Sequence, residues 1–352
     1  MPPGPTDSVL DVLGVGLGHA TVWRDEPDPP HGRGIARTGV TVIDPGGNLF
    51  RTPLPAGGAV LNGAGECTGF LSLSEWGRLE TPIFLTSTMQ VGRVYDAACE
   101  LLMAEDPGIG DVDVVIPVVA ECDDSYLSDP RRMQVTADDV ATALAEARAS
   151  RGASQPPPEG AVGAGTGMSF MGYKGGIGTA SRVLPDGSVL AAVALTNIDE
   201  PERLTIDGVP FGRVASAGAG SARSRRSPRP PDGSCIVVLL TDGPLDASGC
   251  GRLARRAGLG LARTGSTARH GSGEIFLAAA TGLRASRGTA SGRAPVTGPD
   301  LNPYFAAAVE ATESAALNSL LQAPTVTGYQ GNSSPGIDPD EVVRALEAHG
   351  RA

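Results

Sequence analysis

Residues 215–240 read ASAGAGSARSRRSPRPPDGSCIVVLL, and the character of the chain changes abruptly within this stretch. Residues 215–232 are so rich in Gly, Ser, Arg and Pro that we expect a linker that does not pack against the fold. Residues 235–240 are six consecutive apolar residues, which predict a buried strand. The linker therefore enters a buried strand directly through Gly233-Ser234.

The remainder of the chain alternates apolar strands with helical segments. Short apolar runs predict strands at residues 40–43, 83–86, 112–119, 189–195 and 275–280. Apolar residues at helical spacing predict helices at 91–103 and 305–321. Thr136 with Asp139 opens a further helix that ends near residue 149, and Asp338-Pro339 opens one that ends near residue 348. Together these patterns predict a mixed α/β protein.

The composition limits which binding partners and which cellular compartment we expect for the protein. A net charge of −11 predicts a surface that repels phosphate backbones, so we expect no nucleic-acid partner. No run of about 20 apolar residues predicts a membrane span, and no signal peptide is recognisable at the start. The five cysteines include no CxxC pair, which favours free thiols in the cytoplasm. Without an HExxH motif or a Cys/His cluster, we expect neither a metal nor another cofactor.

The Asp232-Gly233-Ser234 junction has two interpretations. An ordinary turn is the commoner structure for such a tripeptide. The alternative is self-cleavage, in which the Ser234 hydroxyl attacks the Gly233 carbonyl, an ester forms and water resolves it. Ser234 would then carry a free α-amine with a pKa of roughly 7.7–8.0, which can serve as its own base. This chemistry needs no histidine, and the four histidines form no recognisable Ser-His-Asp pattern.

A second polar cluster, Gly271-Ser272-Gly273-Glu274, opens the strand predicted at 275–280. Ser272 and Glu274 share one face of an extended chain, because side chains alternate along a strand. If this strand neighbours the strand of Ser234, the pair is positioned to relay or orient the nucleophile's proton. The alternative is a Gly-Ser turn followed by an exposed glutamate.

Two glycine-rich stretches lie at residues 163–168 (GAGTGM) and 174–179 (KGGIGT). Neither has the spacing of a phosphate-binding Walker loop, and neither connects a strand to a long helix as a dinucleotide fingerprint does. Nucleotide binding is therefore disfavoured. Close approach of backbone around a small pocket is the better interpretation.

Several segments together resemble the L-aminopeptidase/D-esterase family, which includes the β-aminopeptidases. They are residues 11–21 (DVLGVGLGHAT), 37–41 (RTGVT), 61–69 (LNGAGECTG) and 117–127 (PVVAECDDSYL), the two glycine-rich stretches, and Gly233-Ser234. The resemblance implies one catalytic domain over residues 1–352. Its fold would be a four-layer α-β-β-α sandwich, similar to the Ntn hydrolases but connected differently. It also implies an α chain, 1–233, and a β chain, 234–352, that stay together and form homo-oligomers.

The resemblance assigns roles by position. Ser234 matches the autoproteolytic nucleophile, Ser272 and Glu274 match its supporting residues, and Asn197 matches an oxyanion-stabilising amide. Glu121 matches the carboxylate that holds the substrate's free amine. The resemblance also implies contributions from a phenol, Tyr126, as a second oxyanion donor, and from four pocket residues, Gly165, Thr166, Gly167 and Met168. One departure is Cys235, because an aliphatic residue is expected after the nucleophile.

The implied function is a self-processing N-terminal-nucleophile aminopeptidase, amidase or esterase. It would release N-terminal L-, D- or β-amino acids from short peptides, amides or esters through an acyl-enzyme on Ser234. Two alternatives remain on the sequence alone. The first is a nylon-oligomer-type amide hydrolase or an acyltransferase on the same fold. The second is an uncleaved, non-catalytic binding protein.

Overall fold

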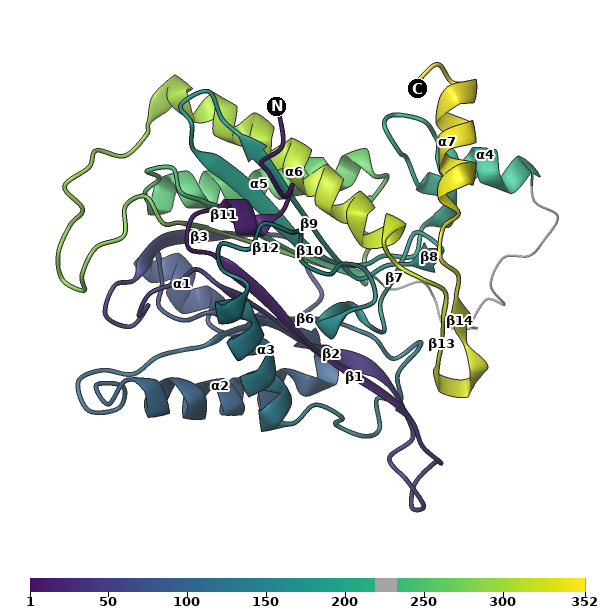
Figure 1. The fold of residues 1–352 in the computed structure, drawn as a ribbon, viewed down its shortest axis with the longest axis horizontal. Coiled ribbons are helices and arrows are strands. Elements are labelled where there is room, and N and C mark those ends of the chain that lie inside the picture. The colour runs from purple at the N-terminus through teal and green to yellow at the C-terminus, as the bar shows by residue number, and fades with distance from the viewer. Residues whose placement is uncertain (219–232, 352) are drawn as a thin grey trace.

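Two β-sheets pack face to face and carry helices on their outer faces (Figure 1). The computed structural model describes residues 1–218 and 233–351. The four-stranded sheet has the order β1 (Gly16–Asp25), β2 (Ile35–Asp44), β5 (Ile83–Ser87), β6 (Val118–Cys122). The six-stranded sheet has the order β4 (Arg78–Leu79), β3 (Leu54–Gly63), β12 (Gly273–Ala280), β11 (Ser234–Thr241), β10 (Val189–Asn197), β9 (Ile177–Val183).

The helices form the outer layers. Helices α2 (Val91–Glu105) and α3 (Ala137–Ala149) lie on the four-stranded sheet, and α5 (Ala247–Arg263) and α6 (Asn302–Leu321) lie on the six-stranded sheet (Figure 1). Separate hydrophobic cores fill the two helix–sheet interfaces and the sheet–sheet interface. The predicted four-layer α-β-β-α sandwich is confirmed. Smaller elements surround it: α1 (Phe70–Trp76), α4 (Phe211–Gly218), α7 (Pro339–Ala348), and the strand pairs β7 (Ser169–Phe170) with β8 (Tyr173–Lys174) and β13 (Val326–Thr327) with β14 (Ser333–Ser334).

Strand β11 is buried on both faces, which is why its sequence is apolar without alternation. Cys235, Val237 and Leu239 belong to the core under the helices, whereas Ile236 and Val238 belong to the core between the sheets. Cys235 therefore fills a position in the helix-side core, where a thiol behaves as a small apolar group. Its departure from the family pattern is a matter of packing.

Most predicted elements are confirmed, including the Thr136–Asp139 capping box of α3 and the Asp338 cap of α7. The strand predicted at 112–119 is wrong over most of its length, since β6 begins only at Val118. Val112 and Val114 are exposed and alternate with Asp111 and Asp113, so this stretch has no buried face to keep it in a sheet. The predicted linker is also too long at its start, because α4 continues to Gly218; residues 219–232 lie outside the described residues.

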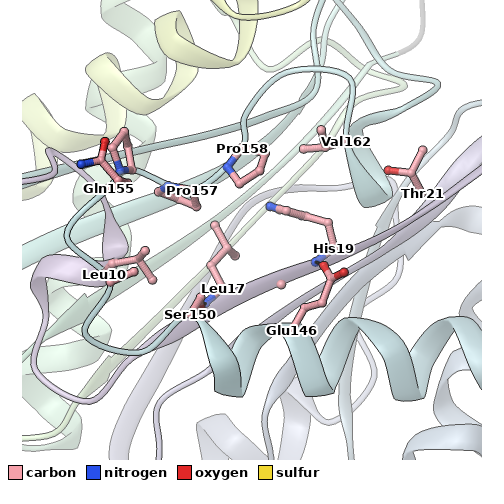
Figure 2. A pocket seen from close by; sticks show the side chains of 13 residues that line it. Leu10, Leu17, His19, Thr21, Glu146, Ser150, Gln155, Pro157, Pro158 and Val162 are labelled. Carbon is pink, nitrogen blue, oxygen red and sulfur yellow. Dashed lines mark hydrogen bonds between the residues drawn. The ribbon is translucent and has the colours of Figure 1, made fainter.

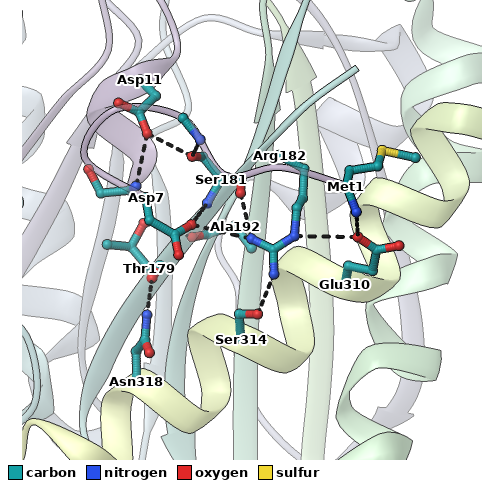
Figure 3. A network of polar contacts seen from close by, with 12 residues as sticks. Met1, Asp7, Asp11, Thr179, Ser181, Arg182, Ala192, Glu310, Ser314 and Asn318 are labelled. Atoms are coloured by element: carbon teal, nitrogen blue, oxygen red, sulfur yellow. Dashed lines mark hydrogen bonds and ion pairs between the residues drawn. The ribbon is translucent and has the colours of Figure 1, made fainter. Parts of the chain in front are cut away.

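The N-terminal segment covers strand β9, an edge strand of the six-stranded sheet. The Val183 amide donates to the Pro2 carbonyl at 2.9 Å, and the Ser181 amide donates to Asp7 Oδ1 at 2.8 Å. Arg182 extends the contact to Ser314 and Glu310 of α6 (Figure 3). These bonds occupy backbone groups that an open edge would leave available for pairing with another chain.

Candidate active site

Ser234 is the first residue of β11, and the register of the sheet determines its neighbours. Asn197, the last residue of β10, is its antiparallel partner, and Gly273, the first residue of β12, is its parallel partner. Because β11 and β12 run in parallel, both begin at the same edge of the sheet. The condition on which the Ser272–Glu274 hypothesis depends, that the two strands are neighbours, is therefore met.

Ser272 and Glu274 form a buried pair beside this strand start. The Ser272 hydroxyl donates a short hydrogen bond to Glu274 Oε1. Glu274 Oε2 is buried and has no hydrogen-bond partner among the described residues. Burial raises the pKa of Glu274, although the bond from Ser272 opposes the shift. A buried carboxyl with one oxygen unused is a typical proton acceptor at a reaction site.

Gly233 lies directly against these groups. A β-carbon placed there would lie 3.0 Å from the Asn197 carbonyl oxygen and 3.3 Å from Ser272 Oγ. Space around Gly233 is therefore tight, and a β-carbon there would press on these neighbours, whereas its φ angle is not one that only glycine favours. The carbonyl of Gly233 accepts a hydrogen bond of 3.1 Å from the Gly273 amide. An amide donor on the carbonyl next to a serine is suited to stabilising an oxyanion there.

Asn197 is held by both ends of its side-chain amide. Its Nδ2 donates to the Asp123 carbonyl at 2.8 Å, and its Oδ1 accepts from the Ser169 amide at 3.1 Å. One N–H of the amide remains for another acceptor. Tyr126 lies in the turn that follows Asp123, and its own carbonyl accepts from Asn332 Nδ2 at 2.8 Å. The oxyanion roles of Asn197 and Tyr126 stay predictions.

Glu121 reaches the same edge from the facing sheet. A β-carbon on Gly65 would lie 3.2 Å from Glu121 Oε1 and 3.6 Å from the Gly273 α-carbon. Gly65 therefore lies between the Glu121 carboxylate and the start of β12. Glu121 Oε1 accepts from the Glu66 amide at 2.8 Å, and Oε2 accepts a short bond from the Thr88 hydroxyl. Burial raises the pKa of Glu121, and these two donors oppose the rise.

The glycine-rich residues predicted to line the pocket are all buried: Gly165, Thr166, Gly167 and Met168. The next residue along the chain, Ser169, donates its amide to the Asn197 side chain, so this stretch leads directly to Asn197. Contact between these residues and a substrate stays a prediction.

Lys174 is a residue whose importance the sequence analysis missed. It is the only lysine in the chain, it is fully buried, and its Nζ donates to the carbonyls of Gly165, Met168 and Gly175 at 2.9, 2.6 and 2.6 Å. Burial lowers the pKa of Lys174 to about 7, and the charge of nearby Asp124 opposes that shift. The feature of the sequence that could have identified it is the presence of a single lysine inside a glycine-rich stretch. Its ammonium connects the two glycine-rich stretches by hydrogen bonds to carbonyls of both.

A cavity of about 430 Å³ lies away from this site, between β1, α3 and the segment 153–162 (Figure 2). It is lined mainly by apolar groups such as Leu17, Pro157 and Pro158, with the His19 ring and Glu146 beside them. None of the candidate catalytic residues lines it. Among the described residues, no cluster of three His, Cys, Asp or Glu side chains is arranged to hold a metal ion. The described helices include none long and apolar enough to cross a membrane.

Comparison with known proteins agrees with this geometry. The L-aminopeptidase D-Ala-esterase/amidase of Ochrobactrum anthropi, described as a variant of the Ntn-hydrolase fold, superposes with a TM-score of 0.88 at 33% identity, covering 99% of this chain and 96% of that one. A Burkholderia sp. β-aminopeptidase gives a TM-score of 0.87 at 37% identity with the same coverage. The fold is therefore that of the Ntn-hydrolase-like serine aminopeptidases.

Sequence comparison assigns the family. A model of peptidase family S58 matches residues 7–334. The β-peptidyl aminopeptidase BapA of Sphingosinicella xenopeptidilytica is 36% identical over 360 residues, which cover 98% of this chain and 88% of that protein. The chain belongs to peptidase family S58. It is a hydrolase of the N-terminal-nucleophile type, as the sequence predicted.

Proposed function

We propose that the chain cuts itself between Gly233 and Ser234, and that Ser234 then acts as the nucleophile of an aminopeptidase for short peptides, amides and esters. The observation that carries the proposal is the register at the start of β11. Ser234 lies between Asn197 and Gly273, and the carbonyl on its N-terminal side already accepts a hydrogen bond from the Gly273 amide.

In self-cleavage, Ser234 Oγ attacks the Gly233 carbonyl carbon. Its proton passes through Ser272 to Glu274, the buried carboxyl with an unused oxygen. The Gly273 amide stabilises the oxyanion of the tetrahedral intermediate. Breakage of the C–N bond returns the proton to the departing Ser234 amine and leaves an ester. Water then hydrolyses the ester, freeing the Gly233 carboxylate and the Ser234 hydroxyl.

In turnover, the new α-amine of Ser234 is the base for its own hydroxyl. Attack on the substrate carbonyl gives a tetrahedral intermediate, and Asn197 stabilises its oxyanion with the N–H that is not bonded to Asp123. The intermediate collapses to an acyl-enzyme when the amine or alcohol leaves with the proton that the Ser234 α-amine had taken up. Glu121 binds the substrate's free ammonium, for which a buried carboxylate is the natural partner. Water releases the amino acid.

The two processed chains are expected to remain together. Strands β11 and β12 of the β chain lie between β3 and β10 of the α chain in one sheet, so separation would break two strand interfaces. We further propose that these αβ units form a homo-oligomer in the cytoplasm. Light scattering of the processed protein after size-exclusion chromatography tests the assembly.

The substrate proposal follows the relatives, whose names specify a β-peptidyl aminopeptidase in one case and an L-aminopeptidase and D-Ala-esterase/amidase in another. We expect the chain to release β-alanine or L-alanine from their amides. Product analysis with and without an added amine distinguishes hydrolysis from acyl transfer.

Intact mass spectrometry of the purified protein beside its Ser234→Ala variant tests the proposal. The wild-type protein should give two polypeptides, residues 1–233 and 234–352, and the variant a single inactive chain. A wild-type protein that remains whole and active, or a variant cut at the same bond, would refute the proposed function.

A further inference from the structure

Strand β3 contains an extra residue directly opposite the start of β12. Glu274 pairs with Asn62 but Ile275 pairs with Val60, so Leu61 has no partner in the ladder. Such a bulge bends its strand and redirects the neighbouring side chains, and bulges are common beside active sites. The side chain next to this bulge is that of Asn62.

The Asn62 amide is bound to the backbone of the segment that leads into β12. Its Nδ2 donates to the carbonyls of Ser272 at 2.5 Å, Arg269 at 2.6 Å and His270 at 3.3 Å. All three neighbours are acceptors, which identifies this end of the side chain as the nitrogen.

The bond to Ser272 has a consequence for the scissile carbonyl. The Ser272 carbonyl and the Gly273 N–H belong to one planar peptide group, in which they point in opposite directions. Fixing the carbonyl therefore fixes the direction of the N–H, which donates to the Gly233 carbonyl at 3.1 Å. A hydrogen bond accepted at the carbonyl also polarises the peptide and strengthens the bond that its N–H donates.

We propose that Asn62 is a positioning residue for self-cleavage, which aims and polarises the Ser272–Gly273 peptide at the carbonyl that Ser234 attacks. This inference rests on the proposed function. Asn62 contacts neither the scissile bond nor the nucleophile, and it acts through the peptide between them. Because Asn62 lies in the α chain and Ser272 in the β chain, the same contact connects the two chains after processing.

Asn62→Asp tests the inference, because it keeps the shape of the side chain and replaces the donor with an acceptor. Asn318→Asp is the matched control: Asn318 Nδ2, on α6, donates to a single carbonyl, that of Thr179 in β9, at 2.8 Å (Figure 3). Each full-length chain is made by cell-free synthesis, and conversion into its two fragments is followed on denaturing gels. Melting temperatures are measured in parallel.

We expect self-cleavage of Asn62→Asp to be at least about tenfold slower, since loss of a direct oxyanion donor typically costs 10²- to 10³-fold and this donor would be only weakened. The Asn318→Asp control should cleave within about twofold of wild type. Mature Asn62→Asp enzyme should lose less in kcat than in the rate of self-cleavage, because turnover stabilises its oxyanion with Asn197, whereas the Gly273 N–H serves the Gly233 carbonyl.

Wild-type cleavage rates in Asn62→Asp would overturn the inference and leave the proposed function intact. So would a slowing that Asn318→Asp reproduces at equal loss of melting temperature, because that indicates a structural role alone. If Asn62→Asp does not fold, Asn62→Ala, which removes the donor without adding charge, is held to the same criteria. Absence of cleavage in the wild-type chain would overturn both proposals.

Discussion

The six-stranded sheet carries two polar networks, one along its edge strand β9 and one at the start of its central strands β11 and β12. They differ in how many of their polar groups have hydrogen-bond partners. In the network on β9, Asp7 of the N-terminal segment binds Ser181 and Arg182 of the strand, and Glu310 of α6 forms an ion pair with Arg182 (Figure 3). At the start of β11 and β12, by contrast, Glu274 has a buried oxygen without a hydrogen-bond partner among the described residues.

The difference agrees with the proposal that the β9 network stabilises the fold and that Glu274 takes part in the reaction. A completed network leaves no donor or acceptor for another molecule. A buried carboxyl oxygen without a hydrogen-bond partner lowers the free energy of unfolding, and such groups are typically found where the carboxyl takes part in a reaction. The pKa directions agree, because burial raises the pKa values of both Glu274 and Glu121.

Glu274→Gln should have the largest effect. The amide cannot accept the Ser234 proton, so self-cleavage should slow by about 10²-fold or more, as for loss of a general base. Burial raises the pKa of Glu274, so the carboxylate becomes protonated at a higher pH than an ordinary glutamate does. As the pH is lowered, wild-type cleavage should therefore begin to decline before the pH reaches about 4.3, the usual pKa of a glutamate. Gel assays of cleavage against pH measure both. Unchanged cleavage in Glu274→Gln would remove Glu274 from the mechanism.

Lys174→Met tests whether the buried lysine supports the site. Methionine fills similar space but leaves the carbonyls of Gly165, Met168 and Gly175 without their donor, so we expect a loss of about 3 kcal/mol in the free energy of unfolding. Urea denaturation measures this loss. Arg182→Met, which removes a cation from the β9 network, serves as the control. A loss of unfolding free energy in Arg182→Met that equals or exceeds the loss in Lys174→Met would contradict the supporting role assigned to Lys174.

The sequence predicted the parts of the site that local pattern encodes. An apolar run after a polar linker predicted β11, and alternation predicted that Ser272 and Glu274 share a face. Asn62 and Lys174 were missed because they act on backbone carbonyls distant in sequence or in loops, and Thr88 because its partner Glu121 lies on the neighbouring strand β6. Such contacts depend on register and on the bulge at Leu61, which no local pattern specifies.

The same limit explains the error at residues 112–119. Apolar residues there outnumber the charged ones, but whether a run joins a sheet depends on what covers its faces. Only the last two of these residues, Val118 and Val119, belong to β6, whereas Val115 is buried in a separate small cluster outside the sheet.

Thr88→Val examines the substrate end of the site. Thr88 is exposed, so the substitution removes the donor to Glu121 with little cost to folding. The pKa of Glu121 should rise further, because burial already raises it and the Thr88 bond opposes the rise. We expect KM for amine-bearing substrates to increase about fivefold, with the acid limb of kcat/KM displaced to higher pH. Thr88→Ser should restore both, and a change confined to kcat would contradict this role.

Glu310→Gln should have the smallest effect and completes the comparison. Glu310 accepts bonds from the Met1 amine at 2.6 Å and forms an ion pair with Arg182 at 3.4 Å, with about a third of its side chain exposed. Solvent screening limits such a pair to about 0.5 kcal/mol of stability. Self-cleavage should proceed at the wild-type rate, since the β9 network serves only to cover a sheet edge. Slower cleavage in Glu310→Gln than in Glu274→Gln would reverse the roles assigned to the two networks.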